Sequence, residues 1–172
     1  MLPRWMRLRE KKTEEILFAP LSGKVLNMEA VPDPAFSEKK LGEGIAIEPT
    51  EGKVCSPVDG EVIYVFPTRH AIGIGSKSGL ELLIHIGVDT VFMDGLGFKE
   101  FVKEGDRVKT GQPLLEFSLD LVKQKATSMI TPIVITNPNQ VDRLEILSPT
   151  LAQMGTTPVM KISMKTKVWR TP

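Results

Sequence analysis

Two short apolar segments on either side of a tight turn predict one β-hairpin. Residues 69–75 and 81–87 are rich in apolar side chains, and residues 76–79, Ser-Lys-Ser-Gly, are typical of a turn. Paired residues of antiparallel strands keep a constant sum of residue numbers, so a turn centred on the middle of 76–79 pairs His70 with His85. These are the only histidines of the chain. The hairpin therefore predicts two imidazoles as direct cross-strand neighbours, with Cβ atoms about 5 Å apart.

The register of this hairpin depends on how the chain turns at its tip. Gly79 also permits a β-bulge, which would shift the pairing by one residue and place the two rings on opposite faces unless a second irregularity restored them. We take the symmetrical turn as the expectation. Two imidazoles on one face can together touch one small anion, one metal ion or each other, so this face is the first candidate site.

Most of the remaining chain consists of short apolar runs of the kind that form β-strands. Gly, Pro, Asn and Asp separate the runs at short intervals, which is typical of antiparallel sheets joined by tight turns. Clear examples are residues 44–47, 61–66, 113–117 and 132–136. Segments 33–40 and 119–126 are exceptions, each long enough for about two helical turns. The pattern predicts an all-β fold, a compact antiparallel β-sandwich or flattened barrel with one or two short helical turns.

A weak internal repeat indicates how such a sandwich is assembled. Residues 19–25, APLSGKV, recur as residues 56–62, SPVDGEV, and residues 104–114 form a third turn-and-strand unit of similar character. Repeated units of this kind bury one another's apolar faces. We therefore expect a fold built from duplicated hairpin motifs.

Length and composition indicate one ordinary domain with extensions. The chain has 172 residues, of which 41% are hydrophobic and 25% charged. No apolar run approaches the roughly 20 residues that a membrane-spanning helix needs, and the start lacks the features of a signal peptide. The single cysteine, Cys55, cannot form an internal disulfide, and without electropositive neighbours we interpret it as a buried structural thiol. We expect a cytoplasmic protein.

The net charge of +1 hides an uneven distribution. Five of the first 12 residues are basic, and residues 146–172 contain four basic and no acidic side chains. Residues 13–160 hold 13 basic and 20 acidic side chains, a net charge of −7. An acidic body argues against a nucleic-acid partner and favours a basic one.

These charges also suggest the domain organisation. We expect the folded domain to span residues 14–162, followed by a basic C-terminal tail at 163–172. The basic N-terminal segment 1–13 has two interpretations. A disordered tail is preferred, and the alternative is a short amphipathic contact with an anionic membrane surface through residues 1–12.

Several segments of the chain occur together, in the same order, in one protein family. Residues 83–91, LIHIGVDTV, are followed by GLGF at 95–98 and EGDRVK at 104–109. This pattern resembles the glucose-class enzyme IIA domain of the bacterial phosphoenolpyruvate-dependent sugar phosphotransferase system. Further segments in the family's order are residues 19–23, 31–36, 42–47, 56–60, 66–74, 117–120 and 131–137. Several motifs in one order are far more specific than any single motif, and the resemblance covers roughly residues 14–162.

The resemblance implies a phosphocarrier. The family accepts a phosphoryl group from the histidine of the small phosphocarrier protein HPr and passes it to a cysteine of a sugar-specific IIB domain. It implies that His85 is the phosphorylated nucleophile, that His70 stabilises the phosphoryl group, and that the Thr68 hydroxyl orients His70. A neutral imidazole nitrogen is nucleophilic at physiological pH, consistent with these roles. The sequence has no P-loop or kinase loop, so we expect neither ATP as the donor nor a cofactor.

The resemblance also implies a docking surface for the two protein partners. Phe36 and Phe66 occupy positions that the family uses as an exposed apolar ring around the histidines. Asp33 and Asp89 occupy acidic positions on its rim, which would face basic residues of a partner. An apolar centre with a charged edge is common in transient protein interfaces. Arg69 receives no role, and the sequence leaves open which sugar the pathway serves.

A biotinyl or lipoyl carrier is one alternative. Residues 102–115 resemble the strand that precedes the modified lysine of such carriers, and residues 159–162, Val-Met-Lys-Ile, nearly match their acceptor tetrapeptide. The order differs, however, because those carriers place the lysine on a hairpin soon after that strand, whereas Lys161 lies far downstream.

A zinc hydrolase on a similar β scaffold is the other alternative. A catalytic zinc site usually has three protein ligands, and the chain has two histidines. Asp89 is the candidate third ligand, but four residues along a strand would move it about 13 Å from His85. We expect no intrinsic metal site, and a zinc ion completed by a partner at His70 and His85 is more plausible than a hydrolytic one.

Overall fold

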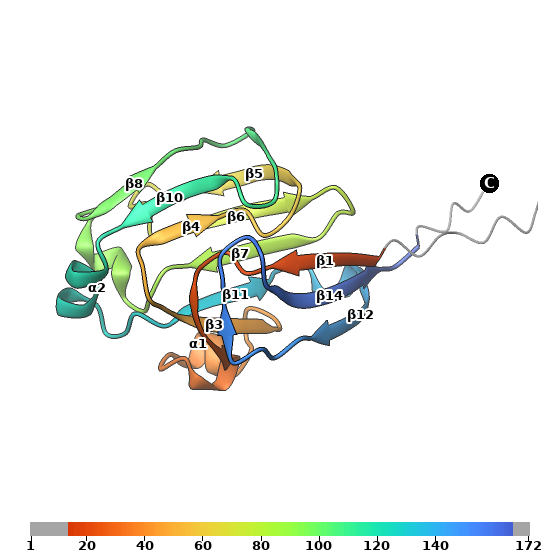
Figure 1. The fold of residues 1–172 in the computed structure, drawn as a ribbon, viewed down its shortest axis with the longest axis horizontal. Helices are drawn as coiled ribbons and strands as arrows, with labels where there is room; N and C mark the ends of the chain where they lie inside the picture. Colours follow the sequence, from red (N-terminus) through yellow and green to blue (C-terminus); the bar gives the residue numbers. More distant parts are fainter. Residues whose placement is uncertain (1–13, 167–172) are drawn as a thin grey trace, which may run out of the picture.

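The computed structural model describes residues 14–166, and these residues form mainly short antiparallel strands (Figure 1). The strands are β1 (Glu14–Phe18), β2 (Gly23–Asn27), β3 (Gly44–Pro49), β4 (Lys53–Cys55), β5 (Gly60–Val65), β6 (Ala71–Ser76), β7 (Glu81–His85), β8 (Phe98–Glu100), β9 (Arg107–Val108), β10 (Pro113–Phe117), β11 (Thr131–Ile135), β12 (Val141–Ile146), β13 (Leu151–Ala152) and β14 (Pro158–Met164). The helices are α1 (Pro34–Ser37) and α2 (Leu119–Lys125), and the 3-10 turns are η2 (Met28–Ala30), η3 (Thr90–Met93) and η4 (Pro138–Gln140).

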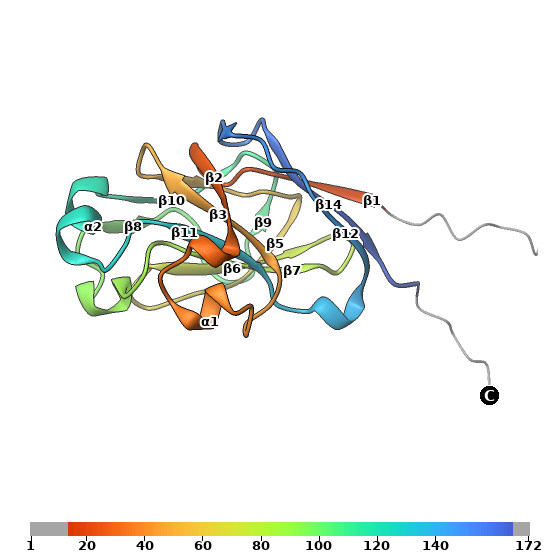
Figure 2. The ribbon, with the colours of Figure 1, turned by 90° about the horizontal axis from the view of Figure 1, so that it is seen from below.

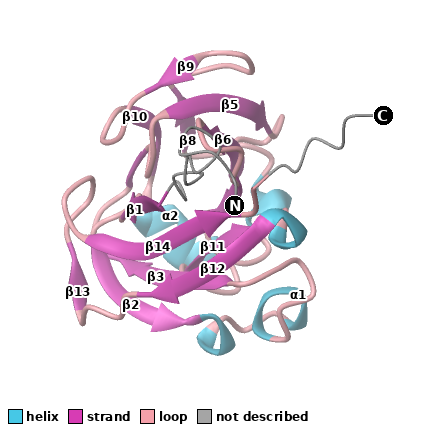
Figure 3. Ribbon diagram, turned by 90° about the vertical axis from the view of Figure 1, so that its right-hand side faces the viewer, coloured by secondary structure: helices cyan, strands magenta, loops and turns pink. Residues whose placement is uncertain are grey.

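The strands form one large and two small sheets, and every pairing between named strands is antiparallel. The large sheet has the order β13-β2-β3-β11-β7-β6-β5-β9, and the small sheets have the orders β1-β14-β12 and β4-β10-β8. Figure 3 shows the strands in magenta as the bulk of the fold, with only short helical segments in cyan. The predicted all-β antiparallel class with short helical turns is confirmed.

The internal repeat corresponds to symmetry in the large sheet. Its two copies lead into β2 and β5, each paired with the next strand and with a two-residue edge strand, and the two halves meet at β11 and β7. The repeated glycines, Gly23 and Gly60, begin these strands where the neighbouring backbone is close. A Cβ atom would lie 2.0 Å from the Glu48 carbonyl oxygen at Gly23 and 1.9 Å from the Gly75 carbonyl oxygen at Gly60. The glycine of the repeat is therefore required by strand packing.

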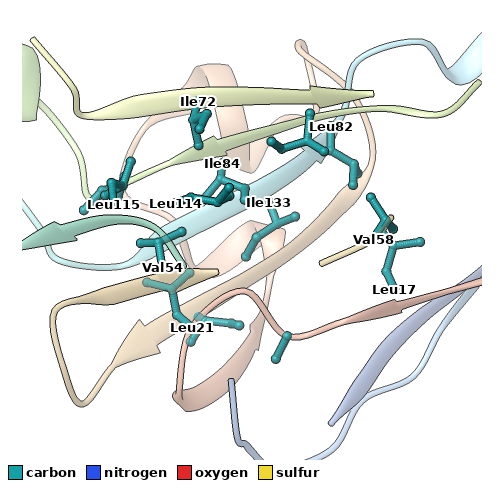
Figure 4. Packing of buried hydrophobic residues seen from close by; sticks show 14 of the residues in the cluster. Leu17, Leu21, Val54, Val58, Ile72, Leu82, Ile84, Leu114, Leu115 and Ile133 are labelled. Carbon is teal, nitrogen blue, oxygen red and sulfur yellow. The ribbon is translucent and has the colours of Figure 1, made fainter. Parts of the chain in front are cut away.

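All three sheets bury their apolar side chains in one core (Figure 4). Leu17 comes from β1, Val54 from β4 and Ile84 from β7, and their side chains point toward the same interior. Alternation along β7 sends Leu82 and Ile84 into this core, while Leu83 and His85 face the opposite side of the large sheet. The outer face of the large sheet therefore carries the histidine.

A second, smaller apolar cluster covers that outer face. Its members are Met28, Val31, Phe36, Ala46, Ala71, Leu83, Val88 and Val134. Figure 2 shows α1 and the chain before it lying over the β3 and β11 region of the sheet. Asp33 caps α1 by accepting a hydrogen bond from the Ala35 amide at 2.9 Å. The helix is shorter than the predicted segment 33–40 because Lys39, with φ of 57°, adopts the left-handed conformation that ends helices.

The β6–β7 hairpin differs from its predicted register by one residue. His85 pairs with Ala71, Ile84 with Ile72 and Leu83 with Gly73, so the predicted pairing of His70 with His85 is wrong. The reason lies in the turn, where Gly79 takes a φ of +95° and the Ser76 amide donates to the Leu80 carbonyl at 2.8 Å. This is the bulged turn that a glycine permits, and it adds one residue to the connection.

The ends of the described region bear on the predicted boundaries. Strand β14 continues to Met164, so Ser163 and Met164, both buried, belong to the sheet although the predicted C-terminal tail began at 163. The predicted N-terminal tail at 1–13, with the membrane contact through 1–12, lies outside the described residues, as do residues 167–172 of the predicted C-terminal tail. Among residues 14–166, no helix combines the length and apolar character needed to cross a bilayer.

Candidate functional site

The two histidine rings meet at the open end of the β6–β7 hairpin. The ladder continues one step past Ala71, because the Ile86 amide donates to the His70 carbonyl at 2.7 Å. In regular strands this register would place His70 and His85 on opposite faces. Arg69, just before His70, instead takes a left-handed backbone with φ of 59° and turns the chain. The ring centroids nevertheless lie 4.9 Å apart, with the planes at 82°, so the backbone departs from a regular strand before Ala71.

The His85 ring is fixed through one of its two nitrogens. Its Nδ1 lies 2.8 Å from the Gly87 carbonyl oxygen. A carbonyl oxygen only accepts, so Nδ1 carries the proton and the neutral ring has its lone pair on Nε2. Burial lowers the pKa of His85, while the Gly87 carbonyl and the carboxylates of Asp33 and Asp89 oppose that shift. The ring is therefore neutral near pH 7, with Nε2 as its nucleophilic atom.

The His70 ring is more strongly held in its neutral form. The residue is buried, and burial, together with the charge of nearby His85, lowers the pKa of His70 to about 4. The Thr68 hydroxyl lies 2.6 Å from His70 Nδ1. When that hydroxyl donates to Nδ1, the ring proton resides on Nε2, which leaves a hydrogen-bond donor on the other side of the ring.

Aromatic rings continue the histidine pair on both sides. Phe36 lies next to His85 with centroids 5.1 Å apart, and Phe66 stacks on His70 at 5.3 Å. Tyr64 extends the row, at 5.4 Å from Phe66. Sequence reasoning missed Tyr64. The sequence feature that could have indicated it is Gly73 on the neighbouring strand. A Cβ atom there would lie 2.5 Å from the Tyr64 ring, so the glycine leaves room for the tyrosine.

The two predicted docking phenylalanines have different environments. Phe66 is 39% exposed, whereas Phe36 is only 4% exposed and belongs to the outer apolar cluster with Met28 and Val31. The prediction of an exposed ring formed by both residues is therefore wrong for Phe36. Its position on the short helix α1 directs the side chain under the His85 ring rather than toward solvent.

The two acidic residues lie near His85 in different ways. Asp33 is partly buried and caps α1, and exposed Asp89 accepts a hydrogen bond from the Thr127 hydroxyl at 2.5 Å. Strand β7 ends at His85, and the chain turns at Gly87, which has a φ of +66°. The separation of His85 and Asp89 expected for a straight strand therefore does not apply. Asp89 is close enough to His85 to favour its charged form. Among residues 14–166, no three His, Cys, Asp or Glu side chains are placed to hold a metal ion.

Comparison with known proteins identifies the family. The family model of the phosphoenolpyruvate-dependent sugar phosphotransferase system, EIIA 1, matches residues 15–141. The chain belongs to this EIIA family. It is 49% identical over 165 residues to the glucose-specific EIIA component of Bacillus cereus, covering 96% of this chain and 100% of the relative. It is 48% identical to the component of the same name from Halalkalibacterium halodurans, covering 88% of each chain.

A solved structure agrees with this assignment. The glucose permease IIA of Mycoplasma capricolum superimposes with a TM-score of 0.81 at 37% identity, covering 87% of this chain and 96% of that one. EIIA proteins are phosphotransferase components of the sugar phosphotransferase system, and this chain has a phosphocarrier role in such a system. The resemblance found in the sequence motifs is confirmed. Family membership therefore favours phosphoryl transfer over the biotinyl carrier and the zinc hydrolase.

An exposed apolar surface near the EIIA histidines was missed in the sequence. Val91, Phe92 and Leu96 are 42%, 79% and 52% exposed. They lie on and just after η3, which is tied to the hairpin by the Thr90 hydroxyl donating to the Ile86 carbonyl at 2.5 Å. The signal in the sequence is the presence of three apolar side chains in a turn, where a solvent-exposed loop ordinarily has polar ones.

Cys55 takes no part in this EIIA site. It is fully buried at the end of β4, and burial raises the pKa of its thiol to about 11. The thiol is therefore protonated at neutral pH and unsuited to accept a phosphoryl group. The predicted burial of Cys55 is confirmed.

Proposed function

We propose that this protein accepts a phosphoryl group on His85 from the histidine of phosphorylated HPr and passes it to a cysteine of a sugar-specific IIB domain. The observation that carries the proposal is the fixed His85 ring, whose Nδ1 is held by the Gly87 carbonyl so that Nε2 is the free nucleophile. As the new bond between Nε2 and phosphorus forms, the bond between phosphorus and the donor histidine breaks. Onward transfer reverses these roles, with a IIB thiolate as the attacking group.

The neighbouring ring supplies stabilisation for the phosphoryl oxygens. With Thr68 donating to its Nδ1, His70 presents an Nε2–H beside the atom that reacts. Phosphoryl transfer depends mainly on positioning and on stabilising charge at the equatorial oxygens. A fixed neutral donor next to the nucleophile meets both requirements. The low pKa of His70 means that this ring is neutral before the phosphoryl group arrives.

The partner proteins would dock on the surface around this pair. Phe66 contributes exposed apolar area on one side, and Phe92 and its apolar neighbours contribute it on the other. Asp33 and Asp89 place negative charge beside His85, which suits a basic partner and raises the rate of encounter more than the affinity. We place this exchange in the cytoplasm. The named relatives are glucose-specific, so a glucose IIB domain is the first acceptor to test.

Reconstitution with phosphoenolpyruvate, enzyme I and HPr tests the proposal. We expect one acid-labile phosphate, located on His85 by mass spectrometry under non-acidic conditions. His85→Ala should accept none while keeping the wild-type melting temperature within a few degrees. Phosphorylation of His85→Ala by HPr, or failure of the wild-type protein to be phosphorylated, would overturn the assignment. Addition of a glucose IIB domain should then discharge the phosphate.

A further inference from the structure

Arg69 occupies a backbone conformation that arginine rarely adopts. Its φ is 59°, within the turn that joins β5 to β6. The Arg69 amide donates to the Phe66 carbonyl at 2.7 Å, and the Phe66 amide donates to the Ala71 carbonyl at 3.0 Å. A side chain with a Cβ atom is disfavoured in this region and remains there only where its surroundings hold it. The strained residue lies directly between Thr68 and His70, both assigned to the phosphoryl site.

Two features outside the turn accommodate the Arg69 side chain. Its Nε forms an ion pair with the Glu100 carboxylate, on strand β8 of a different sheet. Among the residues the structure describes, neither side chain has another ion-pair partner. On a second side lies Gly95, with φ of +83°, where a Cβ atom would come within 3.4 Å of Arg69 Nη1. Glycine at this position leaves room for the guanidinium group.

The position of this ion pair indicates what it does. Both side chains are about 40% exposed, and pairs as exposed as this add little to folding stability. The geometric effect is large by comparison, because the backbone of Arg69 sets where Thr68 and Phe66 lie relative to His70. The Thr68 hydroxyl is 2.6 Å from His70 Nδ1, and the Phe66 ring stacks on His70 at 5.3 Å. A regular strand continued through position 69 would carry Phe66 about 13 Å from His70.

We propose that Arg69 is a positioning residue. Its left-handed backbone, with the side chain paired to Glu100, brings Thr68 and Phe66 against the His70 ring. These contacts fix that ring edge-on against His85, where it can act on a phosphoryl group. The inference rests on the proposed role of His85 as acceptor. It assigns to Arg69 an action through His70 and no contact with the transferred group.

Three variants separate the backbone from the charge. Arg69→Val disfavours the left-handed conformation and removes the ion pair, Arg69→Asn removes the pair but tolerates that conformation, and Glu100→Gln removes only the charge of the partner. We expect Arg69→Val to pass its phosphate to IIB about tenfold more slowly, since a displacement of about 1 Å can cost up to 100-fold in such a site. Arg69→Asn and Glu100→Gln should lose about threefold or less.

Nuclear magnetic resonance of the unphosphorylated proteins measures properties of the two rings that a general loss of stability would not change. In Arg69→Val, the cross-ring Overhauser effect between His70 and His85 should disappear, and the pKa of His70 should rise toward 6.5. Both signals should persist in Arg69→Asn. Ile162→Val, a buried change in β14, serves as the control for a loss of stability and should leave both signals unchanged.

Two results would overturn the proposal. One is an Arg69→Val protein that keeps the ring contact and the low His70 pKa, whatever its transfer rate. If such a protein transferred phosphate slowly, the guanidinium would act directly on the partner or the phosphate. The other is loss of the ring contact in Arg69→Asn as well, which would mean that the conformation at 69 is not the determinant. If wild-type protein is never phosphorylated, the proposed function fails, and the ring measurements still decide the role of Arg69.

Discussion

The His70 and His85 rings meet edge to face at 4.9 Å, although the strand register pairs His85 with Ala71. Each ring is held at its Nδ1 by a different group, His85 by the Gly87 carbonyl and His70 by the Thr68 hydroxyl. The Nε2 atom of each ring is therefore free to interact with a phosphoryl group. The carbonyl can only accept, which makes His85 Nε2 basic, whereas the hydroxyl can donate, which makes His70 Nε2–H a donor.

The first prediction concerns the pH dependence of stability. The folded-state pKa of His70, about 4, is below the ordinary value of 6.5, so between these pH values the unfolded chain binds more protons than the folded one. The contribution of a neutral His70 is thus fully present above pH 6.5 and is lost as the pH falls toward 4. The shift corresponds to at most about 3 kcal/mol.

Urea unfolding of wild-type protein and His70→Gln at several pH values between 7 and 4 measures this effect. The variant lacks the titrating group, so its free energy of unfolding should fall less steeply with decreasing pH. The carboxylates and His85 are present in both proteins, so the comparison isolates the contribution of His70. Parallel pH profiles for the two proteins would show that His70 titrates normally in the folded state.

The second prediction separates the two half-reactions. His70→Gln keeps a hydrogen-bond donor for the phosphoryl oxygens but loses the imidazole that adjusts charge as the phosphate departs. We expect this variant to be phosphorylated at His85 by HPr but to pass the phosphate to IIB at least about tenfold more slowly. Rapid-quench measurement of each step tests this. Equal losses in both steps would mean that His70 is required for acceptance as well.

Much of the fold can be predicted from the sequence because its signals are local. Gly, Pro and Asn between short apolar runs predict hairpins, and the repeated segments at 19–25 and 56–62 correspond to β2 and β5, which occupy matching places in the large sheet. The register at the hairpin tip is different in kind. Both a symmetrical turn and a bulge at Gly79 fit the sequence, and the choice depends on how the completed sheet packs.

The site shows the same division. The two histidines and Thr68 can be found from sequence motifs, but no local preference predicts a left-handed arginine whose side chain pairs with a glutamate on another sheet. The burial of Phe36 is likewise a tertiary effect. It follows from α1 lying over Met28 and Val31 on the outer face of the large sheet, which no pattern within residues 33–40 indicates.

The third prediction concerns the docking surface. Phe66 is exposed, so Phe66→Glu should slow transfer from HPr while leaving the melting temperature nearly unchanged, because transient interfaces depend on a few apolar anchors. Phe36→Ala should instead destabilise the domain by about 3–5 kcal/mol, as expected for truncating a buried phenylalanine. Thermal unfolding and transfer rates measured side by side distinguish the two.

The matched control for Phe66→Glu is Leu151→Glu. Leu151 is 69% exposed, on the edge strand β13 at the far end of the large sheet order from β5, and should tolerate the charge without any effect on transfer. Phe92→Glu, in the exposed apolar part of the proposed surface on η3, should behave like Phe66→Glu. An equal effect of all three substitutions would argue against a localised docking surface.

The last prediction tests what the Thr68 hydroxyl does. Thr68→Val keeps the shape of the side chain but removes the group 2.6 Å from His70 Nδ1, whereas Thr68→Ser keeps the hydroxyl. Without it, the His70 proton is free to move to Nδ1, and the donor on Nε2 is lost from part of the population. We expect Thr68→Val to lose about 1 kcal/mol of stability, to show mixed His70 tautomers in nitrogen-15 spectra, and to pass phosphate to IIB more slowly. Thr68→Ser should restore all three properties. A Thr68→Val protein with a single Nε2–H tautomer and wild-type transfer would show that the surrounding rings, Phe66 and His85, orient His70 without help from the hydroxyl.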